Sequence, residues 1–295
     1  MHSPTNPCLD LLRLWIERTA DAPRAAWFRE MLGAVGEARS GQVLIQAIGL
    51  APRKLGKADL ALTAEDLLAA DRTRPGFDPT GLSIDQTARI GFVLASYRDD
   101  TSFAETVEHL YQTADLGELV AYYRGLAIFP APERLVARAA EGVRSAIKPV
   151  FEAVAHRNPY PREQFDRNAW NQMVLKALFI GSTLSLIQGL DERANPELAR
   201  MLIDYAHERW SAGRAVSPEL WRCVGPFADD RASCDLEQLI AAGTEPERLA
   251  AALALQACPQ PRAREILAQH PLLEKAVEAK QLTWTSIEDP NRARI

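Results

Sequence analysis

Residues 83–114 read SIDQTARIGFVLASYRDDTSFAETVEHLYQTA and contain two pairs of residues with capping-box spacing. Ser83 precedes Gln86 by three positions, and Ser102 precedes Glu105 by the same interval. In such a box, each of the two side chains satisfies a backbone N–H group that the first helical turn leaves unpaired. The segment therefore predicts two consecutive helices, one beginning at each serine.

Helix-start signals recur along the chain, whereas the alternation of β-branched and polar residues that marks half-buried strands is almost absent. Prolines that can occupy the first helical position, where a missing N–H costs nothing, are Pro23, Pro132, Pro196 and Pro218. Further caps are Asp115 with Glu118, Asn195, and Ser217. The expected helices are 8–19, 24–39, 41–50, 63–72, 83–98, 102–114, 116–128, 132–156, 162–180, 196–211 and 217–224, with three or four more between 229 and 281. We therefore predict an all-α protein.

Most of the expected helices are short and separated by brief connectors, and stretches such as 246–255 followed by 261–267 are typical of antiparallel pairs. This favours an irregular α-solenoid of HEAT-like antiparallel helix pairs, although no repeat of fixed period is visible. A compact helical bundle is the alternative. A chain of 295 residues can bury a large core. We expect residues 1–295 to form a single helical domain, or two packed lobes of about 1–157 and 158–295.

The charge and the apolar stretches of the chain restrict its surroundings. A formal net charge of −5 opposes the basic field that binding to nucleic acid or to an anionic membrane needs. The first ten residues lack the basic stretch and apolar core of a secretory signal. The longest apolar stretches are interrupted by Gln46, Lys176 and Ser182, so they fall short of an uncharged membrane span. We expect a cytoplasmic protein that neither binds nucleic acid nor inserts into a membrane.

The cysteines are Cys8, Cys223, Cys234 and Cys258, which lie far apart with no C-x-x-C pair. This spacing speaks against a disulfide framework and against a zinc knuckle, so we expect reduced, mostly buried thiols. The rest of the chain contains no complete cofactor or metal motif. The sequence therefore identifies no cofactor and no metal site.

The expected helix at 162–180 is apolar on nearly every side of its second half, which predicts a central, buried helix. One face consists of Trp170, Met173, Val174, Ala177 and Leu178, and Leu175, Phe179 and Ile180 cover much of the other. Asn171 and Lys176 lie among these residues, so both polar groups need specific partners. In one interpretation Asn171 bonds a neighbouring backbone group and Lys176 reaches solvent; in the other, both face a ligand.

The expected helix at 196–211 places Arg209 within an apolar arc. The arc consists of Leu198, Met201, Leu202, Tyr205, Ala206 and Trp210. A guanidinium group in such a position requires a carboxylate or phosphate partner. Asp191 or Glu192 in the preceding loop could supply the carboxylate, and a bound acidic ligand is the alternative.

Asp204, His207 and Glu208 share the opposite face of this helix at i, i+3 and i+4, a spacing that can present two metal ligands and a base. The metalloprotease pattern H-E-x-x-H is not completed, because Ser211 stands at its last position. A solvated polar face, with Arg200 and Asp204 paired at i, i+4, explains the same residues. These three residues are the catalytic candidates.

Residues 52–60 read PRKLGKADL and carry three cations, Arg53, Lys54 and Lys57, around a glycine that would let the backbone approach a ligand. The spacing is not that of a phosphate-binding P-loop. The segment is either a candidate anion-binding site or a solvated loop between helices.

Residues 158–161 read NPYP, and the two prolines should hold Asn158 and Tyr160 extended in a stiff segment. Such a segment either positions these side chains for a ligand or only turns the chain.

Three tryptophans, Trp170, Trp210 and Trp221, fall in the C-terminal half, and Arg222 follows the last of them. Clustered tryptophans build a core more often than a stacking platform for a flat or prenylated ligand, and both interpretations stay open.

Three long strings, together with PRKLGKADL, resemble the EboA family over most of the chain. They are NPYPREQFDRNAWNQMVLKALFIG at 158–181, GLDERANPELARMLIDYAHERWSAGR at 189–214 and VSPELWRCVGPF at 216–227. Residues at matching positions are Asn158, Trp170, Asn171, Lys176, Asp191, Glu192, Arg193, His207, Arg209, Trp210, Trp221 and Arg222. The resemblance brings no established catalytic residues with it.

The resemblance implies a gene-cluster setting more than a chemistry. EboA-like proteins are encoded with a UbiA-like membrane prenyltransferase, a TatD-like metal hydrolase and a sugar-phosphate-cyclase-like enzyme. The cluster makes or moves a small secondary metabolite, including a scytonemin precursor that is delivered to the periplasm in cyanobacteria. The expected partners are therefore a small metabolite or other proteins of such a cluster, for example the prenyltransferase.

Three functions follow as alternatives. The first is an accessory protein that binds a metabolite or a partner enzyme, which fits the lack of a complete catalytic motif. The second is an enzyme acting on a phosphorylated or prenylated intermediate, in which cations hold anionic groups and a polar helix face transfers protons. Its residues would be Lys54, Lys57 and Arg209 for binding and Asp204, His207 or Glu208 for proton transfer. The third is a pure HEAT-like scaffold.

Overall fold

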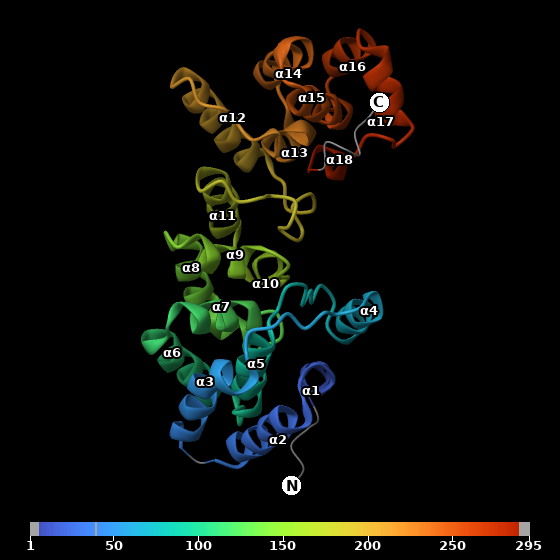
Figure 1. Ribbon diagram of the computed structural model, residues 1–295. Coiled ribbons are helices and arrows are strands. Elements are labelled where there is room, and N and C mark those ends of the chain that lie inside the picture. The colour runs from blue at the N-terminus through green and yellow to red at the C-terminus, as the bar shows by residue number, and fades with distance from the viewer. Residues whose placement is uncertain (1–5, 39, 289–295) are drawn as a thin grey trace. The chain divides into compact units, whose positions relative to one another are not determined.

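The structure is a computed structural model that describes residues 6–38 and 40–288. Within these ranges every named element is helical, which confirms the all-α prediction. Residues 1–5, part of the segment expected to lack a secretory signal, and residue 39, the end of an expected helix, lie outside the described ranges. The chain divides into two compact units, Met1–Asp166 (unit 1) and Arg167–Ile295 (unit 2) (Figure 1).

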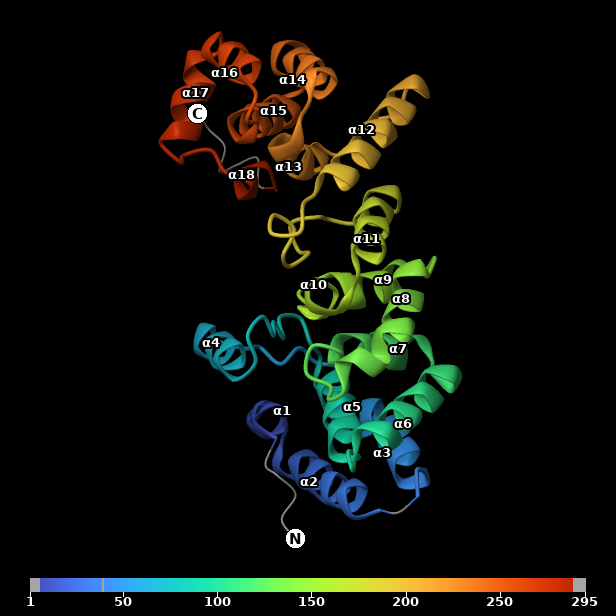
Figure 2. The same cartoon turned by 180° about the vertical axis from the view of Figure 1, so that it is seen from behind.

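Unit 1 is built around α5 (Ile84–Ala95), which packs against α1, α2, α3 and α7 (Figures 1 and 2). Its other elements are α1 (Pro7–Thr19), α2 (Ala22–Glu37), α3 (Gln42–Leu55), α4 (Ala64–Thr73), α6 (Asp100–Thr113), α7 (Leu116–Gly125), the 3-10 turn η1 (Pro132–Leu135), α8 (Val136–Arg144), α9 (Lys148–Ala155) and α10 (Tyr160–Gln164). Ten of the 12 residues of α5 are buried. A Cβ added at Gly91 would lie 3.6 Å from Leu9 Cδ1 and 3.7 Å from Phe28 Cζ, so a small residue lets α1 and α2 approach closely.

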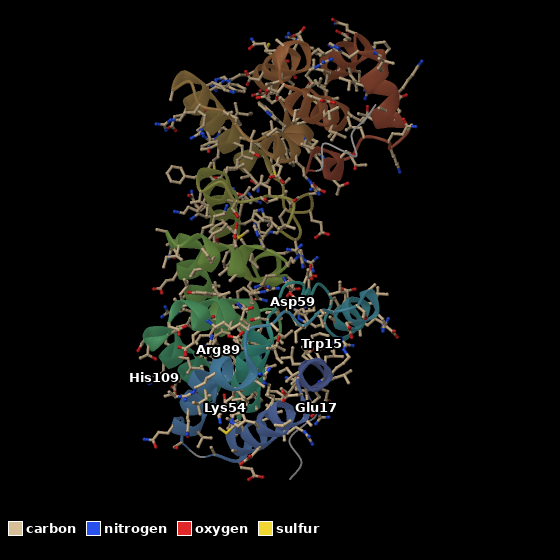
Figure 3. The ribbon with its side chains drawn as sticks, viewed as in Figure 1. Trp15, Glu17, Lys54, Asp59, Arg89 and His109 are labelled. Atoms are coloured by element: carbon tan, nitrogen blue, oxygen red, sulfur yellow. The ribbon has the colours of Figure 1, made fainter. Side chains whose placement is uncertain are left out.

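A buried cation lies inside this central helix. Arg89 is 3% exposed, and its Nε donates a 3.3 Å hydrogen bond to the carbonyl oxygen of Ile48 in α3 (Figure 3). Its terminal nitrogens lie 3.6 Å from Asp85, one turn earlier, and 3.9 Å from Glu118 of α7. A buried charge is tolerated only with such partners. The ion pair therefore ties the centre of unit 1 to two neighbouring helices.

Unit 2 is built around α15 (Glu245–Ala257), which packs against α13, α14, α16 and α17. Its other elements are α11 (Arg167–Phe179), α12 (Pro196–Ser211), the 3-10 turns η2 (Pro218–Leu220) and η3 (Gly225–Phe227), α13 (Trp221–Val224), α14 (Asp230–Ala242), α16 (Pro261–Ala268), α17 (Pro271–Glu278) and α18 (Trp284–Glu288). Residues 249–255 of α15 are all buried, and four of them are alanines. A Cβ at Gly225 would lie 2.7 Å from the carbonyl oxygen of Ala254, so glycine is required where η3 touches α15.

Local caps account for most helix starts. The boxes Ser83–Gln86 and Asp115–Glu118 are present as predicted. The Ser102 box is wrong, because α6 begins earlier and its cap is Asp99, whose carboxylate accepts from the backbone N–H groups of Thr101 and Ser102 at 3.0 Å. A carboxylate is the stronger acceptor and also compensates the positive end of the helix dipole.

Three expected helices are interrupted. The stretch 132–156 is divided into η1, α8 and α9, because Pro149 lacks the N–H that a continuous helix needs. The stretch 162–180 is divided into α10 and α11 at Phe165, whose ψ of 140° is extended and whose buried ring meets Tyr160 edge to face. The stretch 217–224 begins as a 3-10 turn, and Ser217 makes no side-chain cap.

The remaining sequence expectations concern membranes and cysteines. In the described part of the chain, each helix lacks either the length or the apolar content required to cross a membrane. The four cysteines are unpaired, and Cys8, Cys223 and Cys258 are buried, as predicted. Burial raises the pKa of the Cys223 thiol to about 12, which leaves it unreactive at neutral pH.

Asp66 joins α1 to α4. Its carboxylate accepts a 3.1 Å bond from the indole N–H of Trp15 and bonds of 2.9 and 2.6 Å from Arg18, both in α1. It also completes the capping box of α4 with Thr63. The Arg18 guanidinium, with these backbone and hydroxyl donors, holds the pKa of the Asp66 carboxyl well below its usual range.

Replacing Asp66 by alanine should lower the free energy of unfolding at pH 7 by about 2–4 kcal/mol. The cap accounts for about 1 kcal/mol, and the unpaired Trp15 N–H for about 1–3 kcal/mol. Because the folded pKa is lowered, this stabilisation exists above the unfolded pKa of about 3.9 and is lost as the pH falls further. Urea unfolding followed by tryptophan fluorescence measures both effects.

The control is Glu65→Ala, an exposed position in the same turn of α4, which should change stability by about 0.5 kcal/mol or less. The difference between the wild type and D66A should shrink between pH 5 and pH 3. A difference that stays constant over that range would contradict the assigned role of the carboxylate.

Candidate functional site

Asn171, the buried amide in α11, is paired within unit 2. It is 1% exposed and exchanges two hydrogen bonds with Asn195, of 3.3 and 2.9 Å. Asn195 in turn caps α12 by accepting from the N–H of Leu198 at 3.0 Å, as its sequence position predicted. The amide pair therefore fixes the start of α12 against α11.

Helix α11 is buried on one side only. Trp170, Met173, Val174, Ala177 and Leu178 are buried as expected. The prediction of burial on nearly all sides is wrong, because Phe179 is 72% exposed and Leu175 and Ile180 are half-buried. Lys176 follows this exposed side, and its Nζ lies 5.7 Å from the centre of the Phe179 ring. On the buried side, the Arg193 guanidinium lies 4.7 Å from the Trp170 ring.

Arg209 does not use a carboxylate partner, contrary to the sequence interpretation. Its Nε and Nη2 donate to the carbonyl oxygen of Ala215 at 3.2 and 3.0 Å, just after the end of α12. The arc around it is also less buried than expected, since Met201, Tyr205 and Trp210 are half-buried. A cation that binds carbonyl groups at a helix C-terminus compensates the helix dipole, and this explains the position.

Asp191, one of the two carboxylates expected to pair with Arg209, pairs with Arg222 instead. Asp191 accepts two 2.7 Å bonds from Arg222, while Glu192 is exposed in the same loop. Trp221 is 1% exposed and stacks on Trp210 with ring centres 5.9 Å apart. The Arg222–Asp191 pair therefore holds the loop before α12 beside the stacked tryptophans.

The polar face of α12 meets α14. His207 Nε2 lies 2.7 Å from Oδ2 of Asp235, and His207 Nδ1 lies 2.7 Å from Nη2 of Arg231. Arg231 also donates to Asp204 at 3.4 Å, whereas Glu208 is exposed. Of the three catalytic candidates, the structure joins Asp204 and His207 through Arg231.

These two contacts assign the hydrogen-bond roles of the two ring nitrogens of His207. A guanidinium group only donates, so Nδ1 must accept and carries no proton. On the other side of the ring, Nε2 donates to the largely buried carboxylate of Asp235. A general base would need the Nδ1 lone pair, and Arg231 occupies it. The arrangement is that of a polar clamp between two helices.

The cationic segment lies at the end of α3 in unit 1. Arg53 and Lys54 belong to its exposed last turn, and Lys57 follows Gly56, whose φ of 84° ends the helix (Figure 3). The helix C-terminus carries the negative end of the dipole, so it favours these cations and opposes an anion. The segment then pairs with the start of α5 through backbone bonds between Leu60 and Leu82 and between Ile84 and Ala58.

The NPYP segment is internally bonded. The amide of Asn158, 2% exposed, donates to the carbonyl oxygens of Tyr123 and Ala153 at 3.0 and 3.2 Å. Tyr160 is not in an extended linker as expected, because it is the first residue of α10, and its hydroxyl donates to the carbonyl oxygen of Pro132. A Tyr–Pro pair at a helix start is favourable because the proline N–H is not needed there.

Sequence reasoning missed a groove of ≈ 820 Å³ in unit 1, between α1, α2 and the end of α5. These helices pack side by side (Figures 1 and 2). The lining residues are Asn6, Leu9, Asp10 and Arg13 of the α1 region, Arg29, Leu32 and Gly33 of α2, and Leu94, Ala95, Tyr97 and Arg98 at the end of α5. These lining residues form no sequence motif. The one local signal in the sequence was Gly33, a glycine inside the expected helix at 24–39.

The groove combines an apolar part with a charged part. Leu9, Leu32 and Leu94 supply aliphatic surface from three different helices. Arg98 closes one end, where its guanidinium bonds the carbonyl oxygens of Val35, Gly36 and Ala38 and so caps α2. In the described part of the chain, no cluster of three or more His, Cys, Asp or Glu side chains is placed to hold a metal ion.

The structure thus defines a class: an all-helical protein whose buried Asp, Asn and Arg side chains are paired internally in the described part of the chain, and whose first unit carries an open groove. Residues 8–225 match the family model described as metabolite traffic protein EboA, and the chain belongs to this family. The chain has no significant match among curated proteins or among solved structures.

Replacing His207 by alanine should lower the free energy of unfolding by about 1–3 kcal/mol, because Asp235, 8% exposed, then loses its donor. Removing Asp235 as well should recover part of this loss, since no unpaired carboxylate then remains. Denaturant unfolding of the single and double variants measures the coupling. The neighbouring, exposed Glu208→Ala serves as control, with an expected change of about 0.5 kcal/mol or less. Equal effects of H207A and E208A would contradict the clamp.

Proposed function

We propose that the protein is an accessory protein of metabolite traffic that binds a small amphipathic metabolite in the groove of unit 1. The observation that supports this proposal is the groove itself. Its volume of ≈ 820 Å³ is within the range of about 300–1,000 Å³ that is usual for small-molecule sites. Its lining offers leucine side chains for an apolar skeleton, and Arg13, Arg29 and Tyr97 for polar substituents.

Membership of the EboA family supports a role in handling a metabolite. The pairing of His207 supports binding rather than proton transfer, because the lone pair needed by a base is already used. In the gene-cluster setting that the resemblance implies, the partners are the enzymes that make or receive the metabolite. A cytoplasmic HEAT-like body would present the groove to them.

Two glycines of α2 provide a matched test. A Cβ added at Gly33 or at Gly36 meets nothing within 4 Å, and only Gly33 lines the groove. Gly33→Leu should project a side chain into the groove and block binding, whereas Gly36→Leu should leave binding unchanged. Both should raise the free energy of unfolding by up to about 1 kcal/mol, because leucine favours a helix more than glycine does.

The measurement is mass spectrometry of small molecules that co-purify with the full chain from a host expressing its gene cluster. The expected result is one compound enriched with the wild type and with G36L, and absent with G33L. Recovery of the same compound with G33L would exclude the groove as its site. Recovery of no compound with any of the three proteins would contradict the proposed function.

A further inference from the structure

A second, smaller cavity of ≈ 210 Å³ lies in unit 1, where α7 packs against α9 (Figure 2). Val120 and Arg124 of α7 line one side, and Pro149, Glu152 and Ala153 of α9 line the other. His156 and Arg157, which follow α9, complete the lining. Two arginines and a histidine therefore border a space too small for most whole ligands but sufficient for one charged group.

Arg124 is half-buried at the end of α7. Its Nη2 donates to the carbonyl oxygens of Thr80 and Asp78, at 2.8 and 3.3 Å. Gly81, with φ of +74°, brings this loop close to the guanidinium, since a Cβ there would lie 3.9 Å from Arg124 Nη1. The loop between α4 and α5 thus holds one edge of the guanidinium with neutral oxygens only.

The rest of that guanidinium has no partner among the described residues. A guanidinium offers five N–H donors, and the two carbonyl groups use only Nη2. Burial lowers the pKa of Arg124 to about 10; the Asp78 carboxylate opposes this lowering and the neighbouring Arg157 adds to it, and the group stays charged at neutral pH. A half-buried cation that makes no direct ion pair among the described residues favours a bound anion that compensates its charge.

The other charges of the cavity already have partners. Arg157 Nε lies 3.2 Å from Oδ2 of Asp78, and it has positive φ, 51°, a conformation that costs energy for a non-glycine residue. Glu152, the carboxylate of the lining, lies 3.7 Å from Nζ of Lys148. Asp78 is therefore shared: it pairs directly with Arg157 and acts on Arg124 only through longer-range attraction, so a net positive charge remains at the cavity.

From this arrangement we infer that the cavity between α7 and α9 binds an oxyanion, the phosphate or carboxylate group of a small metabolite, through the free N–H donors of Arg124 and Arg157. Planar guanidinium groups bind such oxygens with paired, charge-assisted hydrogen bonds. Val120, Pro149 and Ala153 provide apolar surface for the carbon atoms next to the charged group. The inference does not depend on the groove between α1, α2 and α5.

The test is a titration of the full chain with inorganic phosphate, and separately with acetate, at constant ionic strength and neutral pH. Arginine Nε–H signals in ¹H–¹⁵N spectra report binding, and the Arg124 signal is assigned by its loss in Arg124→Gln. The expected result is a saturable shift of the Arg124 signal with at least one of the two anions. The anion that binds more tightly identifies the class of group.

Two variants test the site. Arg124→Gln should weaken binding by about tenfold or more, the size expected for losing a charge-assisted interaction, as read from Arg157. Val120→Glu places a carboxylate one turn before Arg124, at i, i+4, where it should pair with the guanidinium, keep the fold and block the anion. Circular dichroism checks that both variants fold. If R124Q does not fold, the binding measured with V120E tests the site instead.

The control is Arg144→Gln, an exposed arginine in the last turn of α8, which should bind as the wild type does. Gly33→Leu should also leave anion binding unchanged, which separates this inference from the proposed metabolite groove. The inference is overturned if the folded wild type shows no saturable shift with either anion, or if V120E binds as tightly as R144Q.

Discussion

The burial of one central helix in each unit is the constraint on which the rest of the structure depends. Ten of the 12 residues of α5 and residues 249–255 of α15 are buried, so neighbouring helices must cover their surface. In α15 this is achieved with alanines, which let four helices approach closely. The buried residues of α5 include a charged side chain, Arg89. Its burial requires the partners Asp85, Glu118 and the carbonyl group of Ile48. Removing one partner of a buried ion pair commonly costs about 3–5 kcal/mol.

The same constraint explains why most buried polar residues are structural. Every helix leaves backbone groups unpaired at both ends, and in an all-helical protein the ends are numerous. Asn171 supports a cap through Asn195, Asn158 binds two carbonyl groups, and Arg209 binds the carbonyl group of Ala215. In this fold, a buried polar side chain therefore bonds to a helix end more often than it is placed to bind a ligand.

The groove and the cavity of unit 1 differ from these sites in that part of their lining has no internal partner. In the groove, Leu9 and Leu32 are half-buried and offer aliphatic surface, whereas Arg13, Arg29 and Tyr97 already contact Asp10, Glu17 and Asp100. In the cavity, one edge of Arg124 is held by carbonyl groups, and the other N–H donors are free. A family role in metabolite traffic is consistent with binding sites of this type.

The sequence by itself determined the helical class and the features that depend on neighbouring residues. The box at Ser83, the cap at Asn195 and the burial of Leu198, Leu202 and Ala206 follow from contacts within one or two turns. Only the tertiary structure decided the partner of Arg209, the exposure of Phe179, the burial of Arg89 and the existence of the groove and the cavity. These depend on which distant helices pack together, and a pattern with a period of 3.6 residues identifies a buried face without identifying what covers it.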